Sequence, residues 1–129
     1  MLEPVVISLA DRTIVDRAET PIAMTLARTL THAEHGSKIM AGVSWMAPGE
    51  ISNGWSTQEQ PSEDGLHHLG PVHEFFYLVR GRCLVRWDKG ELAFNANDTI
   101  FFAPGWTYSI ENIGDEEAFL VYACTPPLG

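Results

Sequence analysis

Short apolar segments separated by turn signals run along the whole chain, and this pattern limits the folds that the chain can adopt. The turn signals are pairs that contain glycine or proline: Pro48-Gly49, Asn53-Gly54, Asp64-Gly65, Lys89-Gly90, Pro104-Gly105 and Gly114-Asp115. The segments between them, rich in β-branched and aromatic residues, are 39–46, 75–79, 83–87, 99–103, 108–110 and 118–123. Many short strands at regular spacing are typical of a β-sandwich or a β-barrel. The sequence therefore predicts an all-β fold.

Three further segments have a less regular pattern. Residues 22–30 contain good helix formers but alternate well enough to be predicted as a strand, and residues 10–17 are expected to hold a helical turn. Residues 55–66 are polar and acidic and predict a long loop, which is either a functional lid or a solvated connection. No linker divides the sequence, so residues 1–129 are predicted to form a single domain.

Composition and charge narrow the range of partners. Hydrophobic residues make up 45% of the chain, which is enough for a sizeable core, and the formal net charge is −9. Such an acidic surface repels phosphate backbones and anionic membranes, so neither nucleic acid nor a membrane is an expected partner. The amino terminus does not resemble a secretory signal, and the expected location is the cytoplasm.

The segment from His67 to Gly114 resembles the two sequence motifs of the cupin superfamily. The matching positions are Glu74, Gly81, Pro104-Gly105 and Asn112. Asn97-Asp98 stands where the family usually has Gly-Asp, and asparagine tolerates the left-handed backbone conformation better than most residues. The resemblance implies a single-domain cupin-type β-barrel, a double-stranded β-helix or jelly roll, with its barrel core at about 38–125.

Cupins usually hold one divalent metal with three histidines and the motif glutamate. The resemblance implies a single transition metal (Fe, Mn, Ni, Zn or Cu) and no organic cofactor, with His68, His73 and Glu74 as candidate ligands. Adjacent strand residues point to opposite faces, so an inward Glu74 places His73 outward unless a bulge re-aims it. Tyr108 stands where the second motif has its histidine, and either His73 or Tyr108 is the expected third ligand.

The histidine pair of the first motif has two alignments. Counting back from Glu74 places the pair at His68 and Gly70, or one residue earlier at His67 and Leu69, whereas counting forward from Pro48-Gly49 places it near Trp55 and Thr57. Both alignments stay open at the level of the sequence.

The remaining candidate residues are aromatic. The phenol of Tyr108 either donates a proton or a hydrogen bond in catalysis, together with Glu74, or simply fills the space of a lost metal site. The candidate substrate-binding residues are Trp55, Phe76, Phe102 and Trp106, because small-molecule sites are mostly apolar and aromatic; plain packing is the alternative.

The resemblance implies a small-molecule-binding cupin, and it favours a metal-dependent enzyme that acts on a small polar or aromatic acid in the barrel pocket. Two alternatives stay open: a metal-free acid–base enzyme of the epimerase or cyclase type that uses Tyr108, and a non-catalytic ligand-binding or sensing module. The resemblance also implies a homodimer in which the amino-terminal strands add to a neighbour's sheet.

Overall fold

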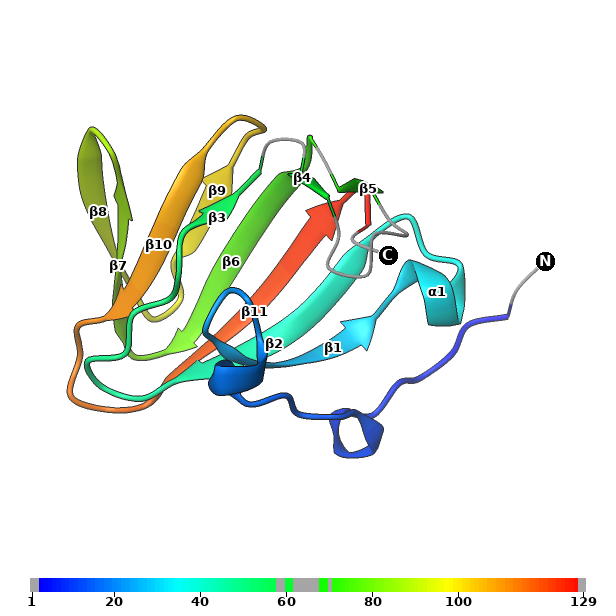
Figure 1. Ribbon diagram of the computed structural model, residues 1–129. Helices are drawn as coiled ribbons and strands as arrows, with labels where there is room; N and C mark the ends of the chain where they lie inside the picture. Colours follow the sequence, from blue (N-terminus) through cyan, green and yellow to red (C-terminus); the bar gives the residue numbers. More distant parts are fainter. Residues whose placement is uncertain (1–2, 58–59, 62–67, 70, 128–129) are drawn as a thin grey trace.

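The computed structural model describes residues 3–57, 60–61, 68–69 and 71–127, and of residues 60, 61, 68 and 69 only the backbone is described. The strands, labelled in Figure 1, are β1 (Thr25–Leu30), β2 (Met40–Met46), β3 (Trp55–Ser56), β4 (Gln60–Pro61), β5 (His68–Leu69), β6 (His73–Arg80), β7 (Arg82–Trp87), β8 (Gly90–Asn95), β9 (Thr99–Phe102), β10 (Thr107–Asn112) and β11 (Ala118–Thr125). The helical elements are the 3₁₀ turns η1 (Leu9–Asp11) and η2 (Arg17–Glu19) and the single-turn helix α1 (His32–His35).

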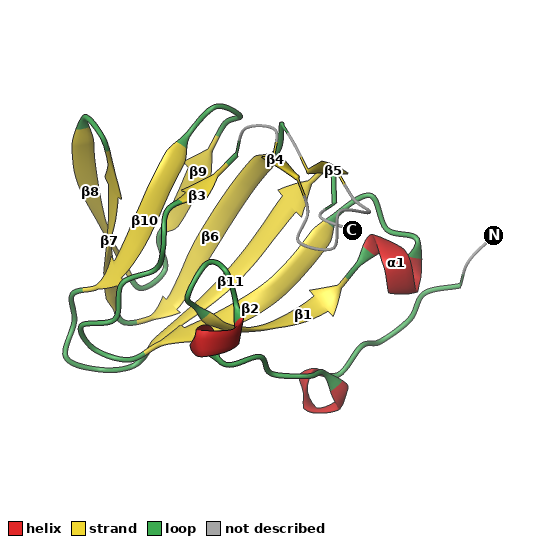
Figure 2. Ribbon diagram, viewed as in Figure 1, coloured by secondary structure: helices red, strands yellow, loops and turns green. Residues whose placement is uncertain are grey.

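Two antiparallel sheets form the body of the molecule. The larger sheet has five strands in the order β1-β2-β11-β6-β9, and the smaller has four in the order β3-β10-β7-β8. Figure 2 shows that strands dominate and that the helical turns lie beside β1, at the amino-terminal end of the chain. The arrangement confirms the predicted all-β fold, with two antiparallel sheets as in a jelly roll.

The core lies between the sheets, and the alternation of side chains along each strand creates it. On β6, Glu74, Phe76 and Leu78 are buried. The residues between them point to the opposite face, as the period of two in a β-strand requires. β11 alternates in the same way, with Leu120 and Tyr122 buried in the core.

Two motif positions have backbone conformations that explain their residue types. Gly81 joins β6 to β7 with a φ of 104°, which L side chains rarely adopt. Asn97 has a φ of 75°, so the expectation that an asparagine replaces the family's glycine at a left-handed position is confirmed. Asn112 is buried, and its amide donates to the carbonyls of Met46 (2.8 Å) and Glu116 (2.9 Å).

The less regular segments follow the predictions in part. The strand expected over 22–30 is β1, and η1 and η2 overlap the two ends of the segment expected to hold a helical turn. The loop prediction for 55–66 was wrong at β3 and β4, which form short pairings with β10 and β5, while residues 58–59 and 62–67 lie outside the described residues. Within the part of the chain that the structure describes, no helix has the length and apolar character needed to span a membrane.

Candidate functional site

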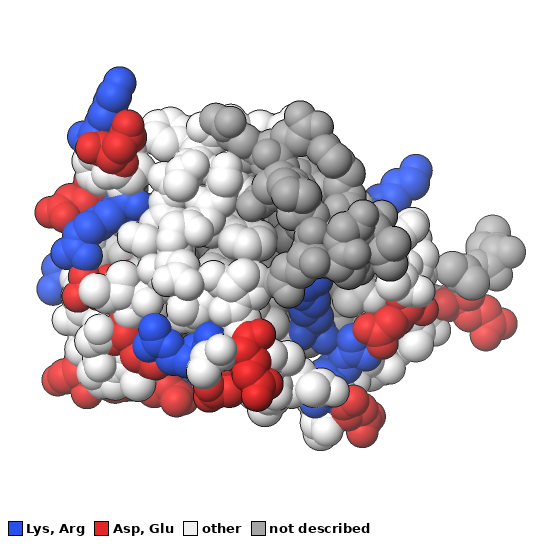
Figure 3. All heavy atoms as spheres, viewed as in Figure 1, with Lys and Arg blue, Asp and Glu red and all other residues white. Residues whose placement is uncertain are grey.

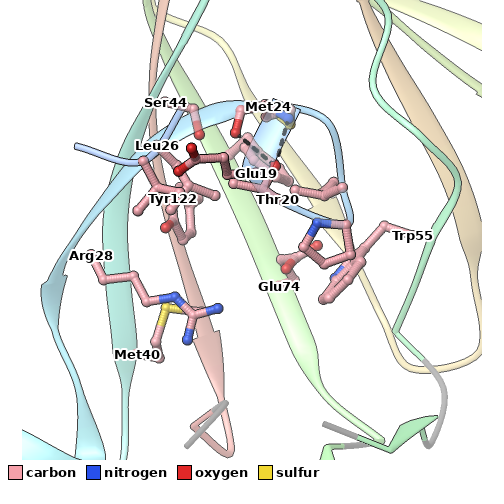
Figure 4. Close-up of a pocket in the computed structure, with 14 residues that line it drawn as sticks. Glu19, Thr20, Met24, Leu26, Arg28, Met40, Ser44, Trp55, Glu74 and Tyr122 are labelled. Atoms are coloured by element: carbon pink, nitrogen blue, oxygen red, sulfur yellow. Dashed lines mark hydrogen bonds between the residues drawn. The ribbon is translucent and has the colours of Figure 1, made fainter. Parts of the chain in front are cut away.

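A pocket of about 200 Å³ opens between the larger sheet, Trp55 and the segment that precedes β1 (Figure 4). Its wall is largely apolar: Ile22, Met24, Leu26, Met40, Trp55 and Phe76. Its polar side chains include Glu19, Arg28, Ser44, Glu74 and Tyr122. A dry cavity of roughly 150 Å³ binds benzene, so the pocket can hold a molecule of about that size with one polar substituent. Figure 3 shows uncharged side chains left of the centre of this view, with charged side chains along its left, lower and right edges.

Glu74 presents a buried carboxyl group to the pocket. β6 places it on the inner face, where it is 4% exposed. The Tyr108 hydroxyl, on β10 of the facing sheet, donates a hydrogen bond to Glu74 Oε1. Burial raises the pKa of Glu74 to about 7, and the bond from Tyr108 opposes this rise. The carboxyl group therefore changes its protonation state near neutral pH, as a general acid or base must.

Aromatic side chains hold the phenol of Tyr108 in place. The ring of Phe102 stacks on the Tyr108 ring with a centroid distance of 3.9 Å and an interplanar angle of 10°. Phe76 packs edge-on against the Tyr108 ring at 6.3 Å and against the Phe102 ring at 6.5 Å. Burial, followed by the nearby carboxylate of Glu74, raises the pKa of Tyr108 well above its usual value. The phenol is therefore a hydrogen-bond donor throughout the neutral range.

The other candidate residues lie in different places. Trp55 and Phe76 line the pocket together with Glu74, whereas Phe102 is buried behind the pocket, against Tyr108. Trp106 is 43% exposed and packs edge-on against Trp87. The substrate-binding role of these residues stays a prediction.

Two of the candidate metal ligands, His73 and Glu74, lie on opposite faces of β6, because successive side chains of a strand alternate between its faces. His73 is exposed on the outer face, where its ring stacks with that of Phe101 at 6.0 Å, so it does not face Glu74. The side chain of His68 lies outside the described residues. Among the residues that the structure describes, no three His, Cys, Asp or Glu side chains are grouped so that they could hold a metal ion.

Strand pairing favours the forward alignment of the first motif. Trp55 is directly opposite Tyr108 in the β3–β10 pair, and both residues lie near Glu74. Thr57 is fully buried, and its hydroxyl donates to the carbonyl of Ala103 at 2.9 Å. An indole, a hydroxyl engaged with the backbone and a hydrogen-bonded phenol then occupy the three histidine positions. The described residues therefore do not fit the metal site of the family: Glu74 is retained, and the imidazoles around it are not.

Of the polar residues that line the pocket, only Glu74 was singled out in the sequence; Glu19, Thr20, Arg28, Ser44 and Tyr122 were not. Arg28 on β1 and Tyr122 on β11 both line the cavity. Met24, just before β1, and Leu26 and Arg28 on β1 stand at intervals of two, and this was a signal for Arg28, because residues two apart on a strand share a face.

The fold and the site together define a class of protein: a jelly roll with a pocket, sized for a small molecule, between its sheets. The chain belongs to the cupin domain family, whose model matches residues 46–124. A curated relative, the uncharacterized protein MJ1618 of Methanocaldococcus jannaschii, is 31% identical over 62 residues, which are 48% of this chain and 50% of that protein. The match thus spans about half the length of the relative.

Solved structures support the fold over nearly the whole chain. A predicted oxalate decarboxylase from Thermotoga maritima has a TM-score of 0.71 at 14% identity, covering 95% of this chain and 99% of the other. KdgF from Halomonas sp. has a TM-score of 0.71 at 9% identity, covering 98% and 96%. The cupin domain of Cnp3 from Schizosaccharomyces pombe has a TM-score of 0.68 at 18% identity, covering 92% and 72%. At these identities the likeness shows the fold alone.

Proposed function

We propose that this cupin binds a small molecule in the pocket between its sheets and transfers a proton to or from it through Glu74. The observation that carries the proposal is the buried pair of Glu74 and Tyr108. The carboxyl group lines the cavity, and the phenol holds one of its oxygens in place from behind. The second carboxyl oxygen is the atom that exchanges the proton with the bound molecule.

The environment of the pair suits this chemistry. A carboxylate in an apolar pocket is poorly solvated and therefore more basic than in water. Its conjugate acid returns the proton to the substrate at a second position, so that the net reaction is an isomerisation or an exchange without any external reductant or oxidant. The apolar lining keeps water away from the reacting carbon atom.

Hydrogen–deuterium exchange tests the proposal with simple carbonyl compounds as probes. Small ketones and keto acids that carry an aromatic ring, such as acetophenone and phenylpyruvate, are incubated with the protein in D₂O. Proton NMR follows the loss of the signal from the carbon next to the carbonyl group. We expect the protein to accelerate exchange above the rate in buffer, and Glu74→Gln to remove this acceleration.

The other outcomes distinguish the alternatives. Binding of the probes, seen as thermal stabilisation, without any accelerated exchange in a broad panel would favour a non-catalytic binding module. Acceleration that persists in Glu74→Gln would contradict the role of the carboxyl group. The absence of both binding and exchange would count against the pocket as a binding site.

Elemental analysis tests the metal-dependent alternative separately. Because the described residues retain Glu74 without the surrounding imidazoles, we expect less than one equivalent of any transition metal in protein purified without chelators. We expect the same content in Glu74→Gln. One equivalent in the parent protein that is lost in the variant would overturn the metal-independent chemistry proposed above.

The proposed assembly is a homodimer. β1 is the outermost strand of the larger sheet, and Val15 and Arg12 of the preceding segment hydrogen-bond to part of its outer edge, so a second copy would mainly contact the exposed side chains of that segment. The segment exposes Val5, Val6 and Ile14, which are 72%, 95% and 58% exposed. Exposed apolar side chains beside an outermost strand favour contact with a second copy of the chain.

A further inference from the structure

Arg28, Gly42 and Tyr122 lie side by side in one row across the larger sheet. Arg28 on β1 is paired with Gly42 on β2, and Gly42 is paired with Tyr122 on β11. Both outer members of the row line the pocket. Figure 4 shows them on the same side of the cavity, across from Glu74 and Trp55.

Gly42 makes room for the hydroxyl group of Tyr122. A Cβ atom at this position would lie 2.4 Å from Tyr122 Oη and 2.6 Å from the carbonyl oxygen of Ala27, both closer than real Cβ contacts allow. Glycine in the interior of a strand weakens the sheet, because it has no side chain to pack and loses more backbone entropy on folding. The sheet thus carries an unfavourable residue at the one place where it accommodates this hydroxyl.

The proton of this hydroxyl finds no acceptor within the described part of the chain. Tyr122 is 7% exposed, and its Oη atom is buried without an acceptor among the described residues. Burial raises the pKa of Tyr122 to about 12, although the positive charge of Arg28 and the contact of its guanidinium, which only donates, with the phenol oxygen act in the opposite direction. The phenol is therefore protonated at neutral pH, and a buried donor without an acceptor costs stability. A bound molecule that supplies an acceptor would remove that cost.

We propose that Arg28 and Tyr122, on the two sides of Gly42, form a subsite that binds the carboxylate group of a small, largely apolar acid. A guanidinium and a phenol on one wall of a pocket are two donors, one of them charged, and a carboxylate offers two acceptor oxygens. The apolar lining suits the rest of the acid. The proposal rests on the proposed function, since the acid would extend from this subsite toward Glu74.

The two carboxyl groups of the pocket do not reverse this preference for an anion. Glu74 already accepts the hydrogen bond from Tyr108 and lies across the cavity from the subsite. Glu19 is exposed to solvent, as Arg28 is, so water and salt screen the effect of Glu19 on the subsite, whereas a carboxylate bound to Arg28 and Tyr122 would contact both donors directly.

A matched pair of probes, benzoate and benzamide, tests the subsite, because they share a ring and differ in charge. Isothermal titration calorimetry measures both with the parent protein, Arg28→Gln and Tyr122→Phe. Arg80→Gln serves as control, since Arg80 loses the same charge outside the pocket, where it pairs with Glu117. We expect benzoate to bind at least about tenfold more tightly than benzamide. Arg28→Gln should weaken benzoate by about tenfold or more, Tyr122→Phe should weaken it by about threefold to tenfold, and Arg80→Gln should change neither.

A second readout concerns the free protein. Tyr122→Phe removes a buried hydroxyl that lacks an acceptor, so its Tm should rise by roughly 2–5 °C while its affinity for benzoate falls. A fall in Tm would show that the hydroxyl has a structural partner, and would overturn the inference. Equal binding of both probes, unaffected by Arg28→Gln, would overturn the subsite but leave the pocket and its proton transfer intact. If neither probe binds at millimolar concentration, the subsite and the proposed function both fail.

Discussion

Glu74 is a carboxyl group that the fold keeps away from water, and stability should depend on pH because of it. Its pKa is about 7 in the folded protein, against an ordinary value of 4.5. The folded state therefore keeps a proton that the unfolded chain releases above its own pKa. The contribution is fully present below about pH 4.5 and is lost as the pH rises through about 7, a decline of up to about 3 kcal/mol.

Glu74→Gln isolates this decline, because glutamine has nearly the same shape and does not ionise. Urea unfolding of both proteins at about pH 5 and about pH 8 gives four free energies of unfolding. The parent protein should lose more stability between the two values than the variant does, by up to about 3 kcal/mol. The same pH dependence in both proteins would show that Glu74 is charged in the folded state across this range.

Tyr108 opposes the effect of burial on Glu74, and this role can be measured separately. The Tyr108→Phe variant keeps the ring that stacks on Phe102 and loses the hydroxyl that donates to the carboxyl group. Because that hydrogen bond lowers the pKa of Glu74, we expect the pKa to rise further in the variant. Carbon-13 NMR of the Glu74 carboxyl carbon through a pH titration measures it directly. A lower pKa in the variant would contradict the assignment.

At the scale of single residues, the sequence predicted the face of a strand on which a residue lies better than the residues that lie beside it on neighbouring strands. Alternation along one strand was enough to place Glu74 inward and His73 outward. The row of Arg28, Gly42 and Tyr122 depends on the register between three strands, of which β1 and β11 are far apart in the sequence. A single sequence shows the period of each strand but not the register between strands. This is why the row was missed, although the spacing along β1 was a signal for Arg28 itself.

The turn between β6 and β7 shows what a motif glycine contributes to two adjoining elements. Gly81 has a φ of 104°, and a Cβ atom there would lie 3.0 Å from Ala118 Cα on β11. Gly81→Ala therefore combines backbone strain with a contact that is too short. Gly36, with a φ of 68° and nothing within 4 Å of its would-be Cβ, provides the control for strain alone.

Gly36→Ala should cost about 1–2 kcal/mol of unfolding free energy, the usual penalty for a left-handed backbone. Gly81→Ala should cost at least about 1 kcal/mol more, because of the added contact with β11. Urea denaturation of both variants at one pH gives the comparison. Equal losses would mean that β11 moves aside without cost.

At the scale of elements, the apolar strands were predictable and the polar ones were not. Segments such as 75–79 and 118–123 carry the β-branched and aromatic residues typical of strands, and β6 and β11 contain them. β3 and β4 lie in a polar, acidic stretch with no such pattern, so only their pairing with other strands identifies them. The pairing of β3 with β10 is also what favours the forward alignment of the first motif over the other. Long-range contacts of this kind leave no local trace in a sequence.

At the scale of the whole molecule, the fold is that of the cupin family, while the described side chains around Glu74 differ from the family's metal ligands. The elements that close the jelly roll are retained: the turn glycine Gly81, the left-handed Asn97 and the buried Asn112. Gly81 and Asn97 allow the left-handed backbone of two turns, and Asn112 donates to two backbone carbonyls, so their roles do not depend on what the pocket contains. Side chains that face the pocket are free of that requirement, and they depart most from the family pattern. Fold recognition and assignment of chemistry therefore rest on different sets of residues.

The assembly of the whole molecule gives a further prediction. Val5 and Val6 are 72% and 95% exposed and precede β1, an edge strand of the larger sheet. If this segment packs on a second copy, sedimentation equilibrium should show a homodimer. Each valine that the contact buries should contribute about 1 kcal/mol or more. Replacing both valines by serine should therefore weaken dimerisation by at least about tenfold. Leu92→Ser is the matched control, because Leu92 is 55% exposed on β8, in the other sheet. The valine variant should keep its pocket and its affinity for benzoate, since neither valine lines the cavity. A parent protein that sediments as a monomer would rule out the dimer. A dimer that only Leu92→Ser weakens would place the contact on the other sheet.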